Sequence, residues 1–214
     1  MAHKPYYNKN GQIVPSVTTV IGRFKESSGL IWWAWDCGMK GINYTQVRDE
    51  AAIVGTILHD MIEASIKKIE FKESDYDKNF AERAKIPFEA FRKWHGRSNV
   101  ILSEAEISLI SEEYQYGGML DALPNGNELY VIDWKSTKRI YPDHIVQVAA
   151  YRQLWNENNP VNRAEDGHIV RFDKETGAFQ HMYLPKKNLD RGFTAFLHMR
   201  LLYDSIREVD KICR

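Results

Sequence analysis

The spacing of hydrophobic residues divides the chain into a helical first half and a mixed second half. Apolar residues recur every three or four positions over 49–69, which predicts an amphipathic helix. Ser16 precedes an apolar run and can begin another helix. Shorter helices are predicted, in chain order, over 17–24, 30–40 and 75–94. Residues 1–12 are expected to form an irregular entry or a short strand.

Beyond residue 99 the pattern changes to short alternating runs, which are typical of strands. Strands are predicted over 100–109, 114–123, 128–136, 167–173 and 178–184, and helices over 141–157 and 188–209, the last capped by Asn188. The pair Asn125-Gly126 predicts a hairpin turn. This order indicates an α/β (α+β-like) fold with a mixed central sheet of about five strands flanked by helices.

The expected organisation is a single domain over 1–214. Within it, 1–98 is mostly helical, 99–160 forms the core, and 161–214 adds a hairpin and a helix. The 214 residues carry 29 basic and 29 acidic side chains, so a nucleic acid would have to bind through a local patch. Two cysteines exclude a disulfide scaffold and a four-cysteine cluster. No run of 18 apolar residues exists, so no membrane contact is expected, and the expected compartment is the cytoplasm.

The first candidate for chemistry is Asp133-Trp134-Lys135, at the end of an apolar strand. Alternate strand residues share a face, so Asp133 and Lys135 point the same way. Burying two charges is costly unless they are paired or bind a metal. Asp121 on the preceding strand offers a second carboxylate, and it reaches the same face only if the connecting turn has an odd length. We therefore expect an odd turn that puts Asp121 opposite Val131.

Two further sets of residues lie on predicted helices. Gly55, His59 and Glu63 are four residues apart and share one flank of their helix. Gln147 and Tyr151 share a flank of the helix that follows the Asp133 strand. Taken singly, these features have ordinary structural explanations: a strand-end ion pair, a structural histidine, and an interface pair.

Together, the four motifs resemble the PD-(D/E)XK nuclease superfamily. The matching residues are Gly55-Thr56-x-x-His59-x-x-x-Glu63, Gly118-x-x-Asp121, Asp133-Trp134-Lys135 and Gln147-x-x-x-Tyr151. They occur in the order and spacing of the RecB-like exonuclease branch, which includes stand-alone phage and mitochondrial genome-maintenance exonucleases. Pro15-Ser16-Val17-Thr18, followed by a tryptophan-bearing helix, also looks like those members. The resemblance covers about residues 13–155 and implies a restriction-endonuclease-like core.

The resemblance implies a metal-dependent DNA nuclease, an exonuclease rather than an endonuclease, acting in DNA recombination, repair or phage DNA processing. Asp121 and Asp133 would bind Mg²⁺ or Mn²⁺, with His59 and the backbone carbonyl of Trp134 as further ligands. Glu63 and Glu106 are additional candidate ligands. Lys135 would position or activate the attacking water. Gln147 and Tyr151 would border the DNA path and complete the catalytic set with Asp121, Asp133 and Lys135.

Candidate contacts to DNA, either a single strand or the end of a duplex, are spread along the chain. The expected DNA-binding residues are Ser16, Trp32, Lys138, Arg139 and Tyr151. The pairs at 67–68 and 186–187 are further basic candidates, and at least two of the tryptophans at 32, 33 and 35 are expected to pack in the core. With two cysteines, no iron–sulfur cluster is expected. A recombination or replication partner is not specified.

Two alternatives remain open from the sequence. The adjacent pair His59-Asp60 also names the HD phosphohydrolases, with His95 and His144 as the remaining ligands. In that enzyme Asp133 and Lys135 would have no role. The other alternative is a non-catalytic nucleic-acid-binding module that keeps the fold without turnover.

Overall fold

The computed structural model describes residues 5–25, 28–126 and 128–213. Its helices are α1 (Val17–Arg23), α2 (Ser28–Met39), α3 (Tyr44–Lys67), the 3₁₀ turn η1 (Glu73–Asp75), α4 (Lys78–Ser98), α5 (Pro142–Asn158) and α6 (Lys186–Ile212). Its strands are β1 (Tyr6–Tyr7), β2 (Ile13–Val14), β3 (Leu102–Ser111), β4 (Tyr116–Pro124), β5 (Tyr130–Lys135), β6 (Asp166–Phe172) and β7 (Phe179–Leu184). The first four residues of the predicted entry segment lie outside the described ranges.

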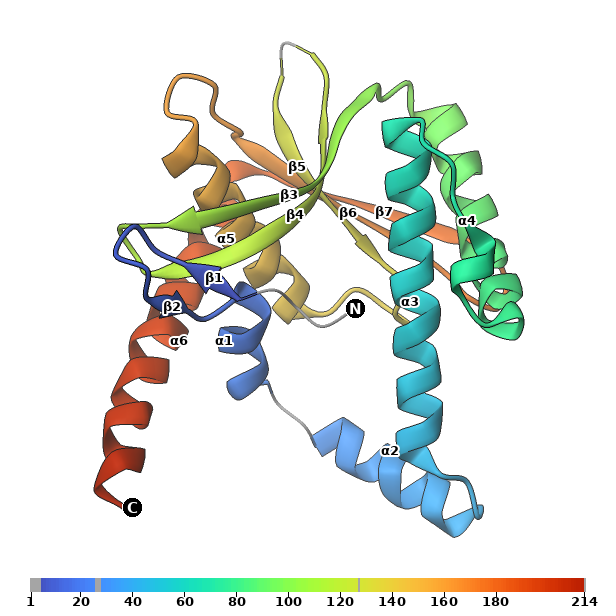
Figure 1. Cartoon of the computed structure of the whole chain (residues 1–214), viewed down its shortest axis with the longest axis horizontal. Helices are drawn as coiled ribbons and strands as arrows, with labels where there is room; N and C mark the ends of the chain where they lie inside the picture. Colours follow the sequence, from blue (N-terminus) through green and yellow to red (C-terminus); the bar gives the residue numbers. More distant parts are fainter. Residues whose placement is uncertain (1–4, 26–27, 127, 214) are drawn as a thin grey trace.

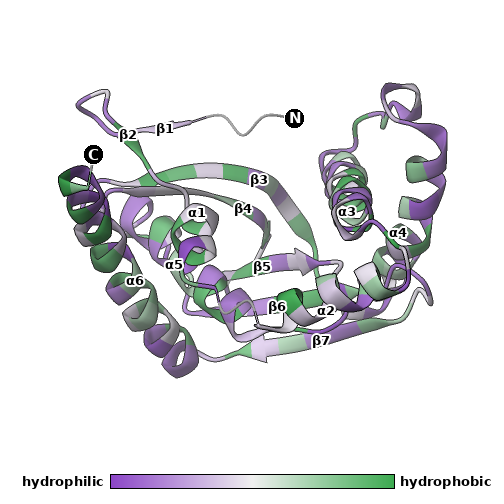
Figure 2. Cartoon of the chain, turned by 90° about the horizontal axis from the view of Figure 1, so that it is seen from below, coloured by the Kyte–Doolittle hydropathy of each residue, from purple (hydrophilic) through white to green (hydrophobic). Residues whose placement is uncertain are grey.

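One mixed sheet organises the molecule, with its strands in the spatial order β3-β4-β5-β6-β7. Neighbours are antiparallel except β5 and β6, which run parallel. A parallel pair needs a long crossover connection, and α5 supplies it. Helices α3 and α4 lie on one side of the sheet, and α1, α5 and α6 lie on the other (Figures 1 and 2). The predicted five-stranded mixed sheet flanked by helices is confirmed.

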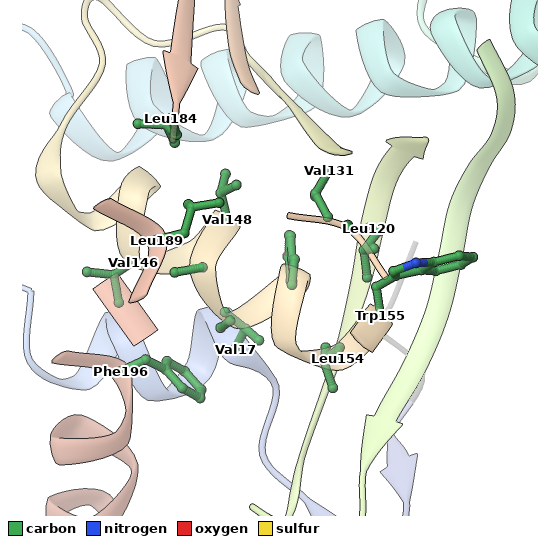
Figure 3. Close-up of a cluster of buried hydrophobic side chains, with 14 of the residues drawn as sticks. Val17, Leu120, Val131, Val146, Val148, Leu154, Trp155, Leu184, Leu189 and Phe196 are labelled. Atoms are coloured by element: carbon green, nitrogen blue, oxygen red, sulfur yellow. The ribbon is translucent and has the colours of Figure 1, made fainter. Parts of the chain in front are cut away.

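The larger hydrophobic core lies between the sheet and helices α1, α5 and α6. Leu120 of β4 and Val131 of β5 belong to it, together with Val148 and Leu154 of α5 and Phe196 of α6 (Figure 3). Each of these five residues is less than 2% exposed to solvent. This core fixes α5 against the strands that carry the candidate catalytic residues.

A second core fills the opposite side of the sheet. Ile132 and Trp134 of β5 pack there with Leu58 of α3 and Phe91 of α4. Val131 and Ile132 therefore enter different cores, as strand alternation predicts. Asp133 follows Val131 by two residues, so it lies on the same face of β5 as Val131, the face toward α5.

The β4–β5 connection has the odd length that the sequence predicts. Five positions, 125–129, separate the two strands, and Ala122 pairs with Ile132. By this register Asp121 lies opposite Asp133, so the prediction of Val131 as its partner is wrong by two residues. Ala122 and Ile132 belong to the same buried cluster, and burying both side chains there sets the register.

Helices α2, α3, α4 and α6 start two to five residues from their predicted positions, and α3 and α6 illustrate the causes. Helix α3 begins at Tyr44 rather than at 49, because the side chain of Asn43 accepts hydrogen bonds from the backbone N–H groups of Thr45 and Gln46. The apolar stripe starts later than this cap, so periodicity alone placed the start too late. Helix α6 begins after Pro185, and Asn188 lies within its first turn instead of capping it.

Helix α2 exposes most of its large side chains. Trp32 is 63% exposed and Trp35 is 59% exposed, whereas Trp33 packs edge-on against Tyr44 of α3. The expectation that at least two of these tryptophans pack in the core is therefore wrong. Within the described ranges, none of the helices combines the length and the apolar character that a membrane crossing requires.

Candidate active site

Helix α3 presents His59 toward the sheet. One turn before it, Gly55 lies close to the loop after β5, because an added Cβ there would be 3.2 Å from Ser136 Oγ. The missing side chain thus allows α3 to approach that loop. One turn after His59, Glu63 pairs with Lys67 at 2.6 Å. Glu63 therefore does not join the acidic residues around His59.

Glu106 and Asp121 lie on neighbouring strands next to His59. The pairs Ala105–Ala122 and Ile107–Leu120 place Glu106 opposite Asp121 in the β3–β4 register. Glu106 has a backbone φ of +55°, which is uncommon for a residue with a side chain. Such backbone conformations persist where the surrounding structure fixes them, and they cluster at functional sites.

Three ligand-type side chains converge at this point. His59 Nδ1 is 3.7 Å from Glu106 Oε1 and 3.7 Å from Asp121 Oδ1. The three ligand atoms all lie within 4.8 Å of one another. These separations are longer than a direct hydrogen bond. The three ligand atoms therefore surround a common point. One nitrogen and two carboxylate oxygens form a donor set that suits a divalent cation.

Asp133 and Lys135 lie beside this group at the end of β5. Asp133 is completely buried, and its Oδ2 is 2.6 Å from Lys135 Nζ. Among the described residues, neither of its carboxylate oxygens accepts a hydrogen bond of good geometry. A buried carboxylate with unsatisfied oxygens is costly, and a bound cation would offset that cost.

The charges of the site perturb one another. Burial lowers the pKa of His59, but Asp121 and Glu106 outweigh it and raise that pKa to about 9. Burial, with a contribution from the charge of Asp121, raises the pKa of Asp133 to about 6 against the opposing effect of Lys135. Burial also raises the pKa of Asp121, against the effects of His59 and Lys135. His59 and Lys135 thus supply the positive charge that this acidic group requires.

The backbone of Trp134 connects β5 with Asp121. The Trp134 N–H donates to Asp121 Oδ2 at 2.7 Å. The N–H and C=O of a strand residue point toward the same neighbouring strand, so the Trp134 carbonyl also faces the side of Asp121. Its indole belongs to the opposite core and holds this segment in place.

Gln147 and Tyr151 form a hydrogen-bonded pair on α5. Gln147 Nε2 donates to Tyr151 Oη at 2.9 Å, which leaves the phenol proton free to donate elsewhere. Burial raises the pKa of Tyr151 well above its ordinary value, and the charges of Asp121 and Asp133 add to this. The Tyr151 ring lies against Gly118, where an added Cβ would be 2.8 Å from Tyr151 Cε1.

The residues predicted to contact DNA lie on several different elements. Ser16 caps α1 by accepting from the Thr19 N–H, and it bridges to Gly117 of β4. Lys138 and Arg139 are exposed in the loop after β5. Lys67 and Lys186, by contrast, are paired with Glu63 and Glu165.

The residues required by the HD alternative do not assemble around His59. Asp60 accepts a hydrogen bond from Tyr76 Oη at 2.7 Å, on another flank of α3. His95 Nε2 is bonded to the Val100 carbonyl at the end of α4. His144 lies on α5, where its Nδ1 accepts from the Tyr141 N–H.

Sequence analysis gave Tyr6 and His144 no role in the nuclease site. Tyr6 packs on Gly117, where an added Cβ would be 2.2 Å from the tyrosine ring. Burial is the main cause of the raised pKa of Tyr6, and the charge of Glu106 adds to it. His144 is buried on the Asp133 side of α5, and burial and Lys135 lower its pKa to about 4. The position of His144 one turn before Gln147 was the available signal for its proximity, whereas nothing local to Tyr6 predicts its long-range contact.

No protein-family model and no curated protein matches this chain. Several solved structures are similar to it. The alkaline exonuclease LHK-Exo from Laribacter hongkongensis matches with a TM-score of 0.36 and 13% identity, over 61% of this chain and 73% of that one. Its complex with dAMP also matches at 0.36 and 13%, over 76% of this chain and 97% of that one. A protein described as a "Putative exonuclease" from Eubacterium rectale matches at 0.44 and 13%, over 85% and 69%. These TM-scores are all below 0.5, so the similarity carries no argument about function.

Proposed function

We propose that this protein is a metal-dependent DNA nuclease, an exonuclease that hydrolyses phosphodiester bonds in DNA recombination, repair or phage DNA processing. The observation that carries the proposal is the convergence of His59, Glu106 and Asp121 within 4.8 Å, beside the buried and unsatisfied carboxylate of Asp133. The motif resemblance to RecB-like exonucleases supports the same assignment.

The donor set fits Mg²⁺ or Mn²⁺. The ion would be held by Asp121, Asp133, Glu106, the Trp134 carbonyl and His59, and His59 would bind as the neutral imidazole after releasing its extra proton. Such an ion would neutralise charge that develops on the phosphoryl oxygens and would lower the pKa of a bound water. In the reaction, water adds to phosphorus, the bond to the leaving sugar oxygen breaks, and that oxygen takes up a proton.

Lys135 and Tyr151 act on the reactants. Lys135 places a compact positive charge beside the carboxylates, where it orients the attacking water and stabilises negative charge in the transition state. Tyr151 keeps its proton because its pKa is high, so its hydroxyl stays able to donate a hydrogen bond in the site. Gln147 fixes the direction of that phenol.

The direct test uses purified protein with end-labelled linear DNA and closed circular DNA, each in single- and double-stranded form. With Mg²⁺, the linear substrates should be degraded and the circles should remain intact. EDTA should stop the reaction because the carboxylates then lack their ion. Undiminished hydrolysis after thorough chelation would overturn metal dependence, and cleavage of circles would overturn the exonuclease assignment.

A pair of variants separates the nuclease from the HD phosphohydrolase. Asp133→Asn keeps the shape of the side chain but removes the charge, so activity should fall by about 10³-fold or more. Asp60→Asn should retain activity, because Asp60 binds Tyr76 outside the site. Near-UV circular dichroism checks that both fold. An inactive Asp60→Asn beside an active Asp133→Asn would favour the HD site, and DNA binding without turnover in the wild type would favour a non-catalytic module.

A further inference from the structure

The loop between β5 and α5 holds an arginine in a fixed position close to the candidate site. Arg139 follows Lys135 by four residues, and its guanidinium carbon lies 4.8 Å from the centre of the Tyr141 ring. Stacking on an aromatic face restricts the guanidinium while its N–H donors stay available at the edges. In the described part of the chain, Arg139 has no carboxylate partner.

The backbone of the same loop is also fixed. Thr137 Oγ1 donates to the Arg139 carbonyl at 2.8 Å, and Arg171 Nε donates to the Thr137 carbonyl at 2.6 Å. Arg171 is paired with Lys135 in the β5–β6 register, so the loop is attached directly to the strand pair that carries the site. Both the backbone and the side chain of Arg139 are therefore held in place.

Packed side chains connect this arginine to the carboxylates. The Tyr141 ring meets the His144 ring edge-on, with centroids 5.5 Å apart. His144 is buried, and the charges of both Asp133 and Lys135 act on it. Lys25 is a second cation close to the Tyr141 ring, and it forms an ion pair with Asp143 at 2.7 Å. Arg139 is thus the cation at Tyr141 that still has its donors free.

We infer that Arg139 binds a non-bridging phosphate oxygen of the DNA strand, at a phosphate next to the one being hydrolysed, and that Tyr141 is a positioning residue for it. The inference rests on the proposed nuclease function and adds a specific phosphate subsite to it. A guanidinium fits a phosphate through two parallel N–H donors, and its planar fork is fixed in advance by the tyrosine ring. The contact reads no base and acts on any sequence.

The first test measures binding separately from cleavage. Fluorescence anisotropy with a labelled single-stranded 20-mer in EDTA gives the Kd, and rates with Mg²⁺ give kcat and KM. Arg139→Ala should weaken binding by about fivefold or more and reduce the slope of log K against log salt by about 0.7, because one phosphate contact is lost. It should raise KM while leaving kcat nearly unchanged.

Tyr141 distinguishes positioning from a general structural role. Tyr141→Phe keeps the aromatic face and should behave as wild type, whereas Tyr141→Leu should reproduce part of the Arg139→Ala defect. The matched control is the pair Arg207 and Tyr203 on α6, where the guanidinium carbon lies 5.7 Å from the ring centre. Arg207→Ala and Tyr203→Leu should leave DNA affinity unchanged. Equal losses in Tyr141→Phe and Tyr141→Leu would overturn the positioning role.

The phosphate itself is identified by single methylphosphonate substitutions, which remove the charge at one position of the DNA. One substituted position should weaken the wild type and have no added effect on Arg139→Ala. If every substitution affects both proteins equally, the subsite is disproved. If wild-type protein binds DNA through Arg139 but never cleaves it, the nuclease proposal fails while the phosphate contact stands.

Discussion

Lys135 compensates a carboxylate that has no access to solvent. Asp133 is fully buried and has a pKa of about 6 even with the ammonium 2.6 Å away. Removing one partner of a buried ion pair is more damaging than removing both, because the remaining charge is left uncompensated. Lys135 is therefore expected to matter for both charge balance and chemistry.

Lys135→Met tests this at nearly constant side-chain volume. Turnover should fall by about 10²-fold or more, because the transition state loses a positive charge and Asp133 tends to hold a proton. DNA affinity in EDTA should change much less, since Arg139 and its neighbours are intact. Steady-state kinetics and anisotropy measure the two effects, and wild-type kcat in the variant would remove Lys135 from the mechanism.

A histidine pair on β6 and β7, far from the candidate site, makes the stability of the fold depend on pH. Trp94 Nε1 donates to His181 Nδ1, and His181 Nε2 is 2.7 Å from His168 Nδ1. Burial, followed by the charge of His181, lowers the pKa of His168 from 6.5 to about 4. The unfolded chain then binds a proton at higher pH than the folded chain, so stability is complete above pH 6.5 and is lost as the pH falls toward 4.

His168→Gln should flatten this dependence. Thermal unfolding followed by circular dichroism at pH 7 and pH 5 should show a smaller drop in Tm for the variant than for the wild type. His198→Gln on the exposed side of α6 is the control and should keep the wild-type drop. An identical drop in all three proteins would contradict the assignment.

At the scale of elements, the contact between β4 and α5 depends on a missing side chain. At Gly118, an added Cβ would lie 2.8 Å from both Leu154 Cδ1 and Tyr151 Cε1. Leu154 is fully buried and Tyr151 nearly so, which leaves little room for either to move. The glycine lets the helix that carries Gln147 and Tyr151 approach the strand that carries Asp121.

Gly118→Ala should therefore displace Tyr151 and destabilise the fold by about 1–3 kcal/mol. Activity should fall together with Tm. Gly96→Ala on α4 is the matched control, because nothing lies within 4 Å of its added Cβ. That control should gain about 0.5–1 kcal/mol from better helix propensity and keep full activity. Chemical denaturation measures both changes, and a neutral Gly118→Ala would show that Tyr151 adjusts freely.

The elements also show what the sequence could predict. Alternation on β5 separated Val131 from Ile132 correctly, because the strand pleat alone sets side-chain direction. The Asp121–Asp133 register was placed two residues off, since it depends on how Ala122 and Ile132 pack in three dimensions. The positive φ of Glu106 had no local signal, as glutamate is not a residue that favours this conformation. Helix α2 shows the converse, because hydrophobic composition alone did not reveal that Trp32 and Trp35 are exposed.

On the scale of the whole molecule, function has to arise from local charge, because the chain has 29 basic and 29 acidic residues. Glu106, Asp121 and Asp133 gather on the neighbouring strands β3, β4 and β5. Many surface cations are paired with neighbouring carboxylates, as Lys67 is with Glu63 and Arg83 with Glu50. Within the described residues, Lys138 and Arg139 are exposed cations without a carboxylate partner in the loop after β5, and under the proposed function they would attract DNA. The charge that DNA would meet is therefore set by this arrangement of side chains rather than by the composition of the chain.

The candidate site also draws its side chains from α3, β3, β4, β5 and α5, so it joins residues as far apart as His59 and Tyr151. The complete set spans more than ninety positions, from His59 to Tyr151, and the site forms only when distant segments have come together. Closing such long loops is slow compared with forming local helices. After dilution from denaturant, helical circular dichroism should recover first, and nuclease activity should return with the slowest phase. The rate at which activity returns would then report the last step of folding. Recovery of both signals at one common rate would show that the helices and the site form together.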